Sequence, residues 1–157
     1  MSASETSIAK VLVVCLGNIC RSPMGEAVLS ATAKKRGLNI AVDSCGTAGY
    51  HVGEEPDDVT ITTCKKHKIP INHRARQLAR SDFTEFTHIL ASDSNNLRDI
   101  KRVAPDNATA EIKLWGSYLD GKAIPDPWYG SLSGFESTFE QCTALSNAFL
   151  DQLEGKQ

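Results

Sequence analysis

The chain has 157 residues, of which 41% are hydrophobic and 23% charged, and these values are typical of one globular domain. A formal net charge of −2 does not indicate the basic surface that nucleic-acid binding needs, and no apolar run is long enough to span a membrane. The five cysteines have the spacing of neither a disulfide framework nor a zinc site, and they lie at Cys15, Cys20, Cys45, Cys64 and Cys142. We therefore expect a cytoplasmic protein that needs no metal ion and no cofactor.

The first residues are polar and carry no signal-peptide pattern, so residues 1–9 are predicted to be a flexible tail and residues 10–157 a single domain. Beyond the tail, apolar runs alternate with segments of helical periodicity. Strands are predicted at Val11–Cys15, Ile40–Ser44, His88–Ala91 and Ile112–Trp115, and helices at Pro23–Arg36, Pro56–Lys68, from Asp93 or Ser94 to Arg102, and within Leu132–Leu153. This alternation predicts an α/β fold in three layers, with a central four-stranded parallel sheet flanked by helices on both faces. Active sites in such folds lie beyond the carboxyl ends of the strands.

The segment between the first strand and the first helix is rich in groups that bind and attack a phosphate. Cys15 and Arg21 are separated by five residues whose backbone N–H groups can surround one anion, beside the positive end of the helix. These phosphate-binding residues are Leu16, Gly17, Asn18, Ile19 and Cys20. Arg21 can hold two phosphate oxygens with its planar guanidinium group. The same positive field favours the thiolate form of Cys15, which is the form that attacks phosphorus.

Other residues of this segment suit a tight loop that leads into a helix. Gly17 lets the backbone approach an anion closely, and Asn18 tolerates a positive φ. Ser22 is expected to cap the helix and to donate a hydrogen bond to the sulfur of Cys15. Pro23 suits the first helical position, where no N–H group is needed.

A second candidate lies in the long loop Gly116–Gly134, which is rich in glycine, proline and aromatic residues. It contains the sequence DPWYG, in which Asp126 stands between Pro125 and Pro127. The two prolines stiffen the backbone around a carboxyl group that lies close to aromatic rings. Such a carboxyl group can act as the general acid that protonates a leaving oxygen.

The paired motifs VCLGNICRSP and DPWYG resemble those of the low-molecular-weight protein tyrosine phosphatases, and the resemblance extends from Lys10 to the end of the chain. It implies hydrolysis of protein phosphotyrosine, and of small aryl phosphates, through a cysteinyl-phosphate intermediate. Cys15 would be the nucleophile, Arg21 the phosphate clamp, and Asp126 the general acid and then the base. Phosphotyrosine proteins would be the partners, and inorganic phosphate or similar oxyanions the inhibitors. Because an exposed aromatic rim can support weak self-association, we expect the protein to be a monomer or weakly self-associating.

The same resemblance implies supporting roles for residues elsewhere. His73 and Ser44, with Asn18, would support the phosphate-binding loop, and Glu26 and Asp43 would be acidic neighbours of His73. Asp93 matches a family position near the site, although it is equally suited to cap a helix. In the family the positions of Cys15 and Cys20 can form a reversible disulfide, so Cys20 is predicted to be the redox partner of Cys15.

A deep pocket with aromatic walls favours phosphotyrosine over the shorter phosphoserine. The candidate wall residues are Leu16, Ile19, Tyr50, Trp128 and Tyr129. Tyr50 stands where many eukaryotic family members have Trp, and Trp128 stands where Tyr is frequent. Both replacements keep an aromatic face.

Three other functions share part of this pattern. Arsenate reductases of the same fold need further redox cysteines after the third strand, and the segment 88–93 contains none. Related phosphoarginine phosphatases often carry Thr where this chain has Ile19, which suits an aromatic ring better than a guanidinium group. A phosphate-binding module would need neither Cys15 nor Asp126. Nucleotide binding is disfavoured because neither of the two common glycine-rich phosphate motifs is present.

Overall fold

The computed structural model describes residues 7–127 and 132–155, except for the side chain of Leu132. Its centre is a parallel sheet of β1 (Ala9–Cys15), β2 (Ile40–Gly46), β3 (His88–Ala91) and β4 (Glu111–Leu114), in the order β2-β1-β3-β4. β1 lies between β2 and β3, so its carboxyl end is flanked by the carboxyl ends of both neighbours. Cys15, the last residue of β1, therefore stands at the edge where active sites of parallel sheets form.

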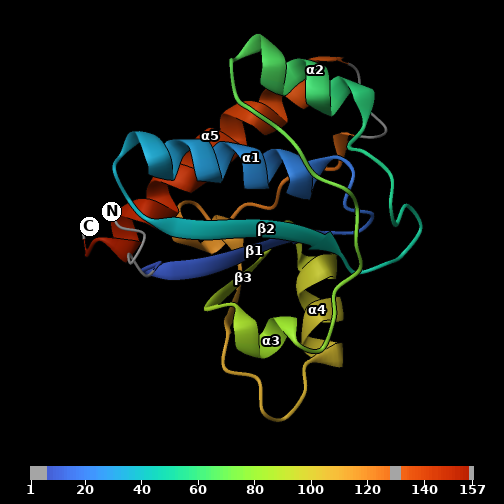
Figure 1. Cartoon of the computed structure of the whole chain (residues 1–157), viewed down its shortest axis with the longest axis vertical. Coiled ribbons are helices and arrows are strands. Elements are labelled where there is room, and N and C mark those ends of the chain that lie inside the picture. Colours follow the sequence, from blue (N-terminus) through green and yellow to red (C-terminus); the bar gives the residue numbers. More distant parts are fainter. Residues whose placement is uncertain (1–6, 128–131, 156–157) are drawn as a thin grey trace.

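The helices cover both faces of the sheet, as Figure 1 shows. The helical elements are α1 (Arg21–Lys35), α2 (Asp58–Lys66), α3 (Asp82–Glu85), α4 (Ser94–Val103), the short 3-10 helix η1 (Trp115–Tyr118) and α5 (Leu132–Leu153). In Figure 1, α1, α2 and α5 lie on one side of the sheet and α3 and α4 on the other. The predicted three-layer α/β fold is confirmed. Within the described residues, no helix combines the length and the apolar character needed to cross a membrane.

Alternate residues of β1 divide the core between these two faces. Val11 and Val13 pack into the cluster that contains the buried residues of α1 and α5. Leu12 and Val14 pack into the other cluster, with Phe83 from α3 among its members. All four of these β1 side chains are fully buried, which explains why the strand is a continuous apolar run in the sequence.

Several boundaries differ from the sequence predictions. β1 begins at Ala9, which is 1% exposed and pairs with Ile40, so the predicted flexible tail was too long at its end. The first helix begins at Arg21 rather than at Pro23. Trp115 opens the 3-10 helix instead of ending β4. The helix α3 was not predicted, because four residues are too few to show a periodicity.

Candidate active site

The loop of residues 15–22 (the phosphate loop) leads from the end of β1 into α1 and directs two donors toward the sulfur of Cys15. The backbone N–H of Asn18 donates to Cys15 Sγ over 3.3 Å, and Ser22 Oγ lies 3.0 Å from the same atom. Cys15 and Ser22 are both buried. The predicted contact of Ser22 with the sulfur is present, but its predicted capping role is wrong: Ser22 lies inside the first turn, and the N-cap residue Cys20 makes no side-chain cap.

Asn18 holds the loop from the inside. Its φ of 60° is left-handed and its side chain is 1% exposed, as its predicted tolerance of positive φ allows. The amide nitrogen donates to Ser22 Oγ over 2.8 Å and to Ser44 Oγ over 3.1 Å. The amide oxygen accepts from the backbone N–H of Arg76 over 2.9 Å and lies 2.8 Å from His73 Nε2. Asn18 thus ties the phosphate loop to two other segments of the chain.

His73 connects this network to two carboxylates. Its Nδ1 lies 3.1 Å from Glu26 and 3.6 Å from Asp43. Ser44 donates to Glu26 over 2.6 Å, and the Nε of Arg76 donates to Asp43 over 3.1 Å. His73, Glu26 and Asp43 offer atoms within 4.8 Å of one another, a spacing that a metal ion could use, yet each atom already has a hydrogen-bond or ion-pair neighbour. The resemblance predicted that His73 supports the phosphate loop with Glu26 and Asp43 as its acidic neighbours, and in the structure these three side chains lie together.

Arg21 is almost fully buried, with 3% of its surface exposed. Its Nη1 donates to Asp93 over 2.7 Å and to the carbonyl of Ile124 over 3.0 Å, and its Nη2 lies 3.7 Å from Asp126. Burial opposes the charge of the guanidinium group, but Asp93, Cys15 and Asp126 outweigh that cost, so the pKa of Arg21 is raised. Asp93 also caps α4, so the two roles considered for it coexist.

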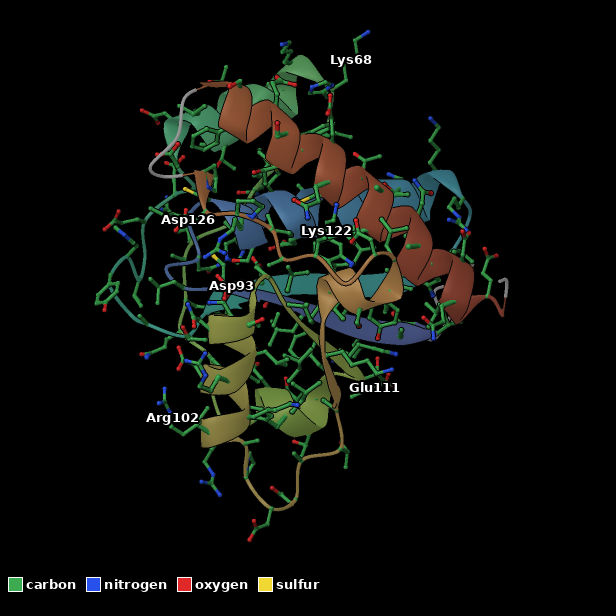
Figure 2. All side chains as sticks on the ribbon, turned by 180° about the vertical axis from the view of Figure 1, so that it is seen from behind. Lys68, Asp93, Arg102, Glu111, Lys122 and Asp126 are labelled. Carbon is green, nitrogen blue, oxygen red and sulfur yellow. The ribbon has the colours of Figure 1, made fainter. Side chains whose placement is uncertain are left out.

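The residues 122–127 (the acid loop) carry Asp126 to the same edge of the sheet. Ile124 is buried, and its N–H donates to the carbonyl of Ser92 over 2.8 Å. A side chain at Gly116 would clash with the carbonyl of Lys122, so glycine allows the loop to pass close to η1. Figure 2 shows Asp126 and Asp93 at the same end of the sheet. The side chain of Asp126 is 35% exposed.

These groups surround a pocket of about 210 Å³ that contains the nucleophile, the clamp and the acid. Of the predicted wall residues, Leu16, Ile19 and Tyr50 line it, whereas Trp128 and Tyr129 lie outside the described residues. His51 also lines the pocket and was not predicted. The full lining is Cys15, Leu16, Gly17, Ile19, Cys20, Arg21, Tyr50, His51 and Asp126.

The thiol of Cys20 lies in a buried and negatively charged environment. Burial, and then the negative charges of Asp57, Cys15 and Asp126, raise the pKa of its thiol to about 12. Cys20 is therefore a protonated thiol at neutral pH. All five cysteines are buried and free.

Sequence reasoning missed the residues that hold the loops from a distance. The backbone N–H of Asp57 donates to the carbonyl of Ile19 over 2.8 Å, and Arg76 and Ile124 act as described above. These contacts join segments that are far apart in the chain, and backbone groups make most of them. No side-chain pattern in the sequence could have indicated them.

A family model described as low molecular weight phosphotyrosine protein phosphatase matches residues 10–157. The phosphatase of that description from Schizosaccharomyces pombe is 44% identical over 154 residues, which cover 94% of this chain and 99% of the relative. A solved protein tyrosine phosphatase from Entamoeba histolytica superposes with a TM-score of 0.89 at 30% identity and covers 94% of this chain and 97% of the other. The structure of a Drosophila arginine phosphatase matches with a TM-score of 0.86 at 36% identity, covering 91% and 96%.

Proposed function

The chain belongs to the low molecular weight phosphotyrosine protein phosphatase family, and on that premise we propose that it hydrolyses protein phosphotyrosine through a cysteinyl-phosphate intermediate. The observation that carries the proposal is the single pocket that Cys15, Arg21 and Asp126 line together. A nucleophile, a cation and a carboxyl group around one cavity are the parts that transfer of a phosphoryl group to sulfur requires.

In the first step the thiolate of Cys15 attacks phosphorus, and the bond from phosphorus to the tyrosine oxygen breaks. The Asn18 N–H donates to the sulfur of Cys15 and Ser22 contacts it, so both groups are placed to stabilise negative charge on that sulfur. Arg21 and the backbone N–H groups of the loop would stabilise the equatorial oxygens of phosphorus. Arg21 is buried and donates a hydrogen bond to Asp93, so its guanidinium group is already held in place. Less conformational freedom of Arg21 is therefore lost when the phosphate binds.

The departing tyrosine oxygen takes the proton of the Asp126 carboxyl group. In the second step the Asp126 carboxylate accepts a proton from water, the water oxygen attacks phosphorus, and the bond to Cys15 breaks. The Ser22 hydroxyl would then donate to the returning thiolate, and inorganic phosphate leaves. Asp126 lies 3.7 Å from Arg21, so the acid stands beside the group that binds the phosphate.

The pocket favours an aromatic substrate. Leu16, Ile19 and Tyr50 give it apolar and aromatic walls beside a cationic floor. A phosphotyrosine ring can pack on these walls while its phosphate reaches Arg21, and small aryl phosphates meet the same walls. We further propose that phosphotyrosine proteins are the partners and that phosphate-like oxyanions are inhibitors. We propose a reducing compartment such as the cytoplasm as the location, because it would keep Cys15 reduced.

The test is phosphate release from matched phosphotyrosine, phosphoserine and phosphoarginine peptides in the presence of EDTA. Selective hydrolysis of phosphotyrosine by the wild-type protein, lost by more than about a thousandfold in Cys15→Ser, is the expected result. The Cys64→Ser variant is the matched control, because Cys64 is a buried thiol on α2 away from the pocket. Preference for the phosphoarginine peptide, or activity that survives in Cys15→Ser, would contradict the proposal.

A further inference from the structure

A second cavity of about 370 Å³ adjoins the active-site pocket. The two cavities share Leu16 and Tyr50, so these side chains form the wall between them. The outer part of the second cavity comes from the loop after β2, the segment 77–83 and the end of α4. Its full lining is Leu16, Thr47, Ala48, Tyr50, Gln77, Leu78, Ala79, Arg80, Phe83, Asp99, Arg102 and Val103. None of the groups proposed to react with phosphate lies in it.

The cavity carries a local positive charge on a chain whose net charge is −2. Arg80 is exposed and has no carboxylate within ion-pair distance among residues 7–127 and 132–155. Arg102 is paired with Asp99, one turn earlier in α4, so those two charges balance. Figure 2 shows Arg102 on α4, on the same side of the molecule as Asp93 and Asp126. The unbalanced charge of the cavity is therefore that of Arg80.

Apolar surface surrounds this charge. Leu16 is 41% exposed, Tyr50 74% and Val103 54%, and each of them lines the cavity. Phe83 and Leu78 contribute to its base. An acidic side chain of a bound peptide would contact Arg80 here. The carbon atoms of the peptide backbone and of the adjacent peptide residues would pack on the apolar walls. A basic side chain would face Arg80 instead.

The cavity adjoins the active-site pocket across two shared side chains, so one extended peptide could enter both. Side chains two residues apart in such a peptide point to the same side and are about 7 Å apart. If a phosphotyrosine ring fills the active-site pocket, a side chain about two or three residues away reaches the cavity across the Leu16 and Tyr50 wall.

We propose that the cavity lined by Arg80 and Arg102 is a specificity subsite for a glutamate or aspartate about two or three residues from the phosphotyrosine. The proposal rests on the proposed phosphotyrosine hydrolysis and deepens it by naming the class of peptide that is hydrolysed best. Arg80 is the recognising residue, and Arg102 completes the rim.

The test uses a phosphotyrosine peptide with alanine at every other position, into which one glutamate or one lysine is placed at each neighbouring position in turn. Glutamate at one position is expected to raise kcat/KM about three- to fivefold, mainly through KM, and added salt should reduce the gain. Arg80→Gln should abolish that gain, and Arg80→Glu should transfer the preference to the lysine peptide at the same position.

Arg98→Gln is the matched control, because Arg98 lies on α4 but outside the cavity and donates a hydrogen bond to Asn95 on the same helix. Equal effects of Arg98→Gln and Arg80→Gln, or a glutamate effect that is the same at every position, would overturn the subsite. The two proposals fail differently. Loss of the all-alanine phosphotyrosine activity removes both, whereas normal hydrolysis of that peptide and of p-nitrophenyl phosphate without a positional effect removes the subsite alone.

Discussion

The phosphate loop and the acid loop meet at Arg21, but the protein holds them by different means. In the phosphate loop, Asn18 is fully buried, and its side chain makes hydrogen bonds with four other residues. In the acid loop, Asp126 is about one-third exposed, and the loop is anchored mainly through Ile124. The phosphate loop is held by a network of buried side-chain hydrogen bonds. The acid loop is held by a few hydrogen bonds of its backbone groups and presents one carboxyl group.

This difference matches the chemistry proposed for each loop. An anion-binding cradle stabilises charge best when its dipoles are oriented before the substrate arrives. A general acid must exchange its proton with water between turnovers, so partial exposure suits it. We therefore expect substitutions in the phosphate loop to affect both folding and activity, and substitution of Asp126 to affect activity alone.

The largest effect that separates the loops is expected for Asp126→Asn. With a phosphotyrosine peptide, kcat should fall about 10²- to 10³-fold, because the tyrosine oxygen must leave without a proton. With an aryl phosphate whose phenol is much more acidic, the loss should be clearly smaller. The measurement is kcat for a series of aryl phosphates, with melting temperature recorded in parallel.

Asp120→Asn is the control for Asp126→Asn, since Asp120 is exposed and its carboxylate accepts from the nearby N–H of Lys122. It should change neither kcat nor stability. An equal loss of kcat for every leaving group in Asp126→Asn would show that Asp126 does not act as the acid.

Asn18→Ala should be the most destabilising of these changes. It removes the side-chain hydrogen bonds and places alanine at a φ of 60°, at a cost of about 2–4 kcal/mol in the free energy of unfolding. Asn18→Gly loses the same bonds without the backbone strain, so it should be about 1 kcal/mol more stable than Asn18→Ala. Denaturant unfolding measures both, with Asn107→Ala on an exposed loop as the control. Equal stabilities for the alanine and glycine variants would contradict the strain.

The sequence predicts the phosphate loop better than the parts that hold it. Cys15, Arg21 and Ser22 lie within eight consecutive residues of the chain, so their spacing alone indicates a phosphate-binding loop. Asp126 was predicted because the DPWYG motif, together with the Cys15 loop, resembles the family, whereas the flanking prolines alone would indicate only a turn. Local chemistry of this kind can be inferred from short segments.

The anchoring contacts could not be found in that way. Ile124 is an ordinary apolar residue whose backbone groups bond to Ser92 and Arg21, and Asp57 reaches Ile19 through its N–H. Such bonds depend on where the chain returns in space, not on side-chain type. The predicted capping role of Ser22 was wrong for a similar reason. Its hydroxyl contacts the sulfur of Cys15 and accepts from the side chain of Asn18 instead of capping the helix.

The two cysteines of the phosphate loop give a pH-dependent prediction. Because the pKa of Cys20 is raised to about 12, its reactive thiolate fraction rises about tenfold for each pH unit between pH 6 and pH 9. After peroxide oxidises Cys15, the rate at which the Cys15–Cys20 disulfide forms should therefore also rise about tenfold for each pH unit in this range. Alkylation at timed intervals and mass spectrometry would follow the linked peptide.

In Cys20→Ser the linked peptide should be absent, and Cys15 should proceed to sulfinic acid, with irreversible loss of activity. A disulfide rate that is flat across this pH range would mean that Cys20 does not attack as a thiolate. Finding only sulfinic acid in the wild-type protein would refute the redox partnership itself.

The smallest effect is expected at the wall between the two cavities. Tyr50 is 74% exposed, so Tyr50→Ala should leave stability nearly unchanged. It should raise KM for phosphotyrosine peptides about two- to threefold by removing ring contact, while Tyr50→Phe keeps the wild-type KM. A large loss of kcat in Tyr50→Ala would mean that the rim takes part in holding one of the loops.

The shared guanidinium group of Arg21 has a thermodynamic consequence. It would bind the phosphate, and it also donates to the carbonyl of Ile124 that anchors the acid loop. Two events that depend on one side chain are linked, and such linkage is reciprocal. If a bound oxyanion favours the ordered state of the acid loop by some factor, the ordered state of that loop must raise the affinity for the oxyanion by the same factor. The affinity for the phosphate product and the fraction of molecules with an ordered acid loop would then depend on the same equilibrium.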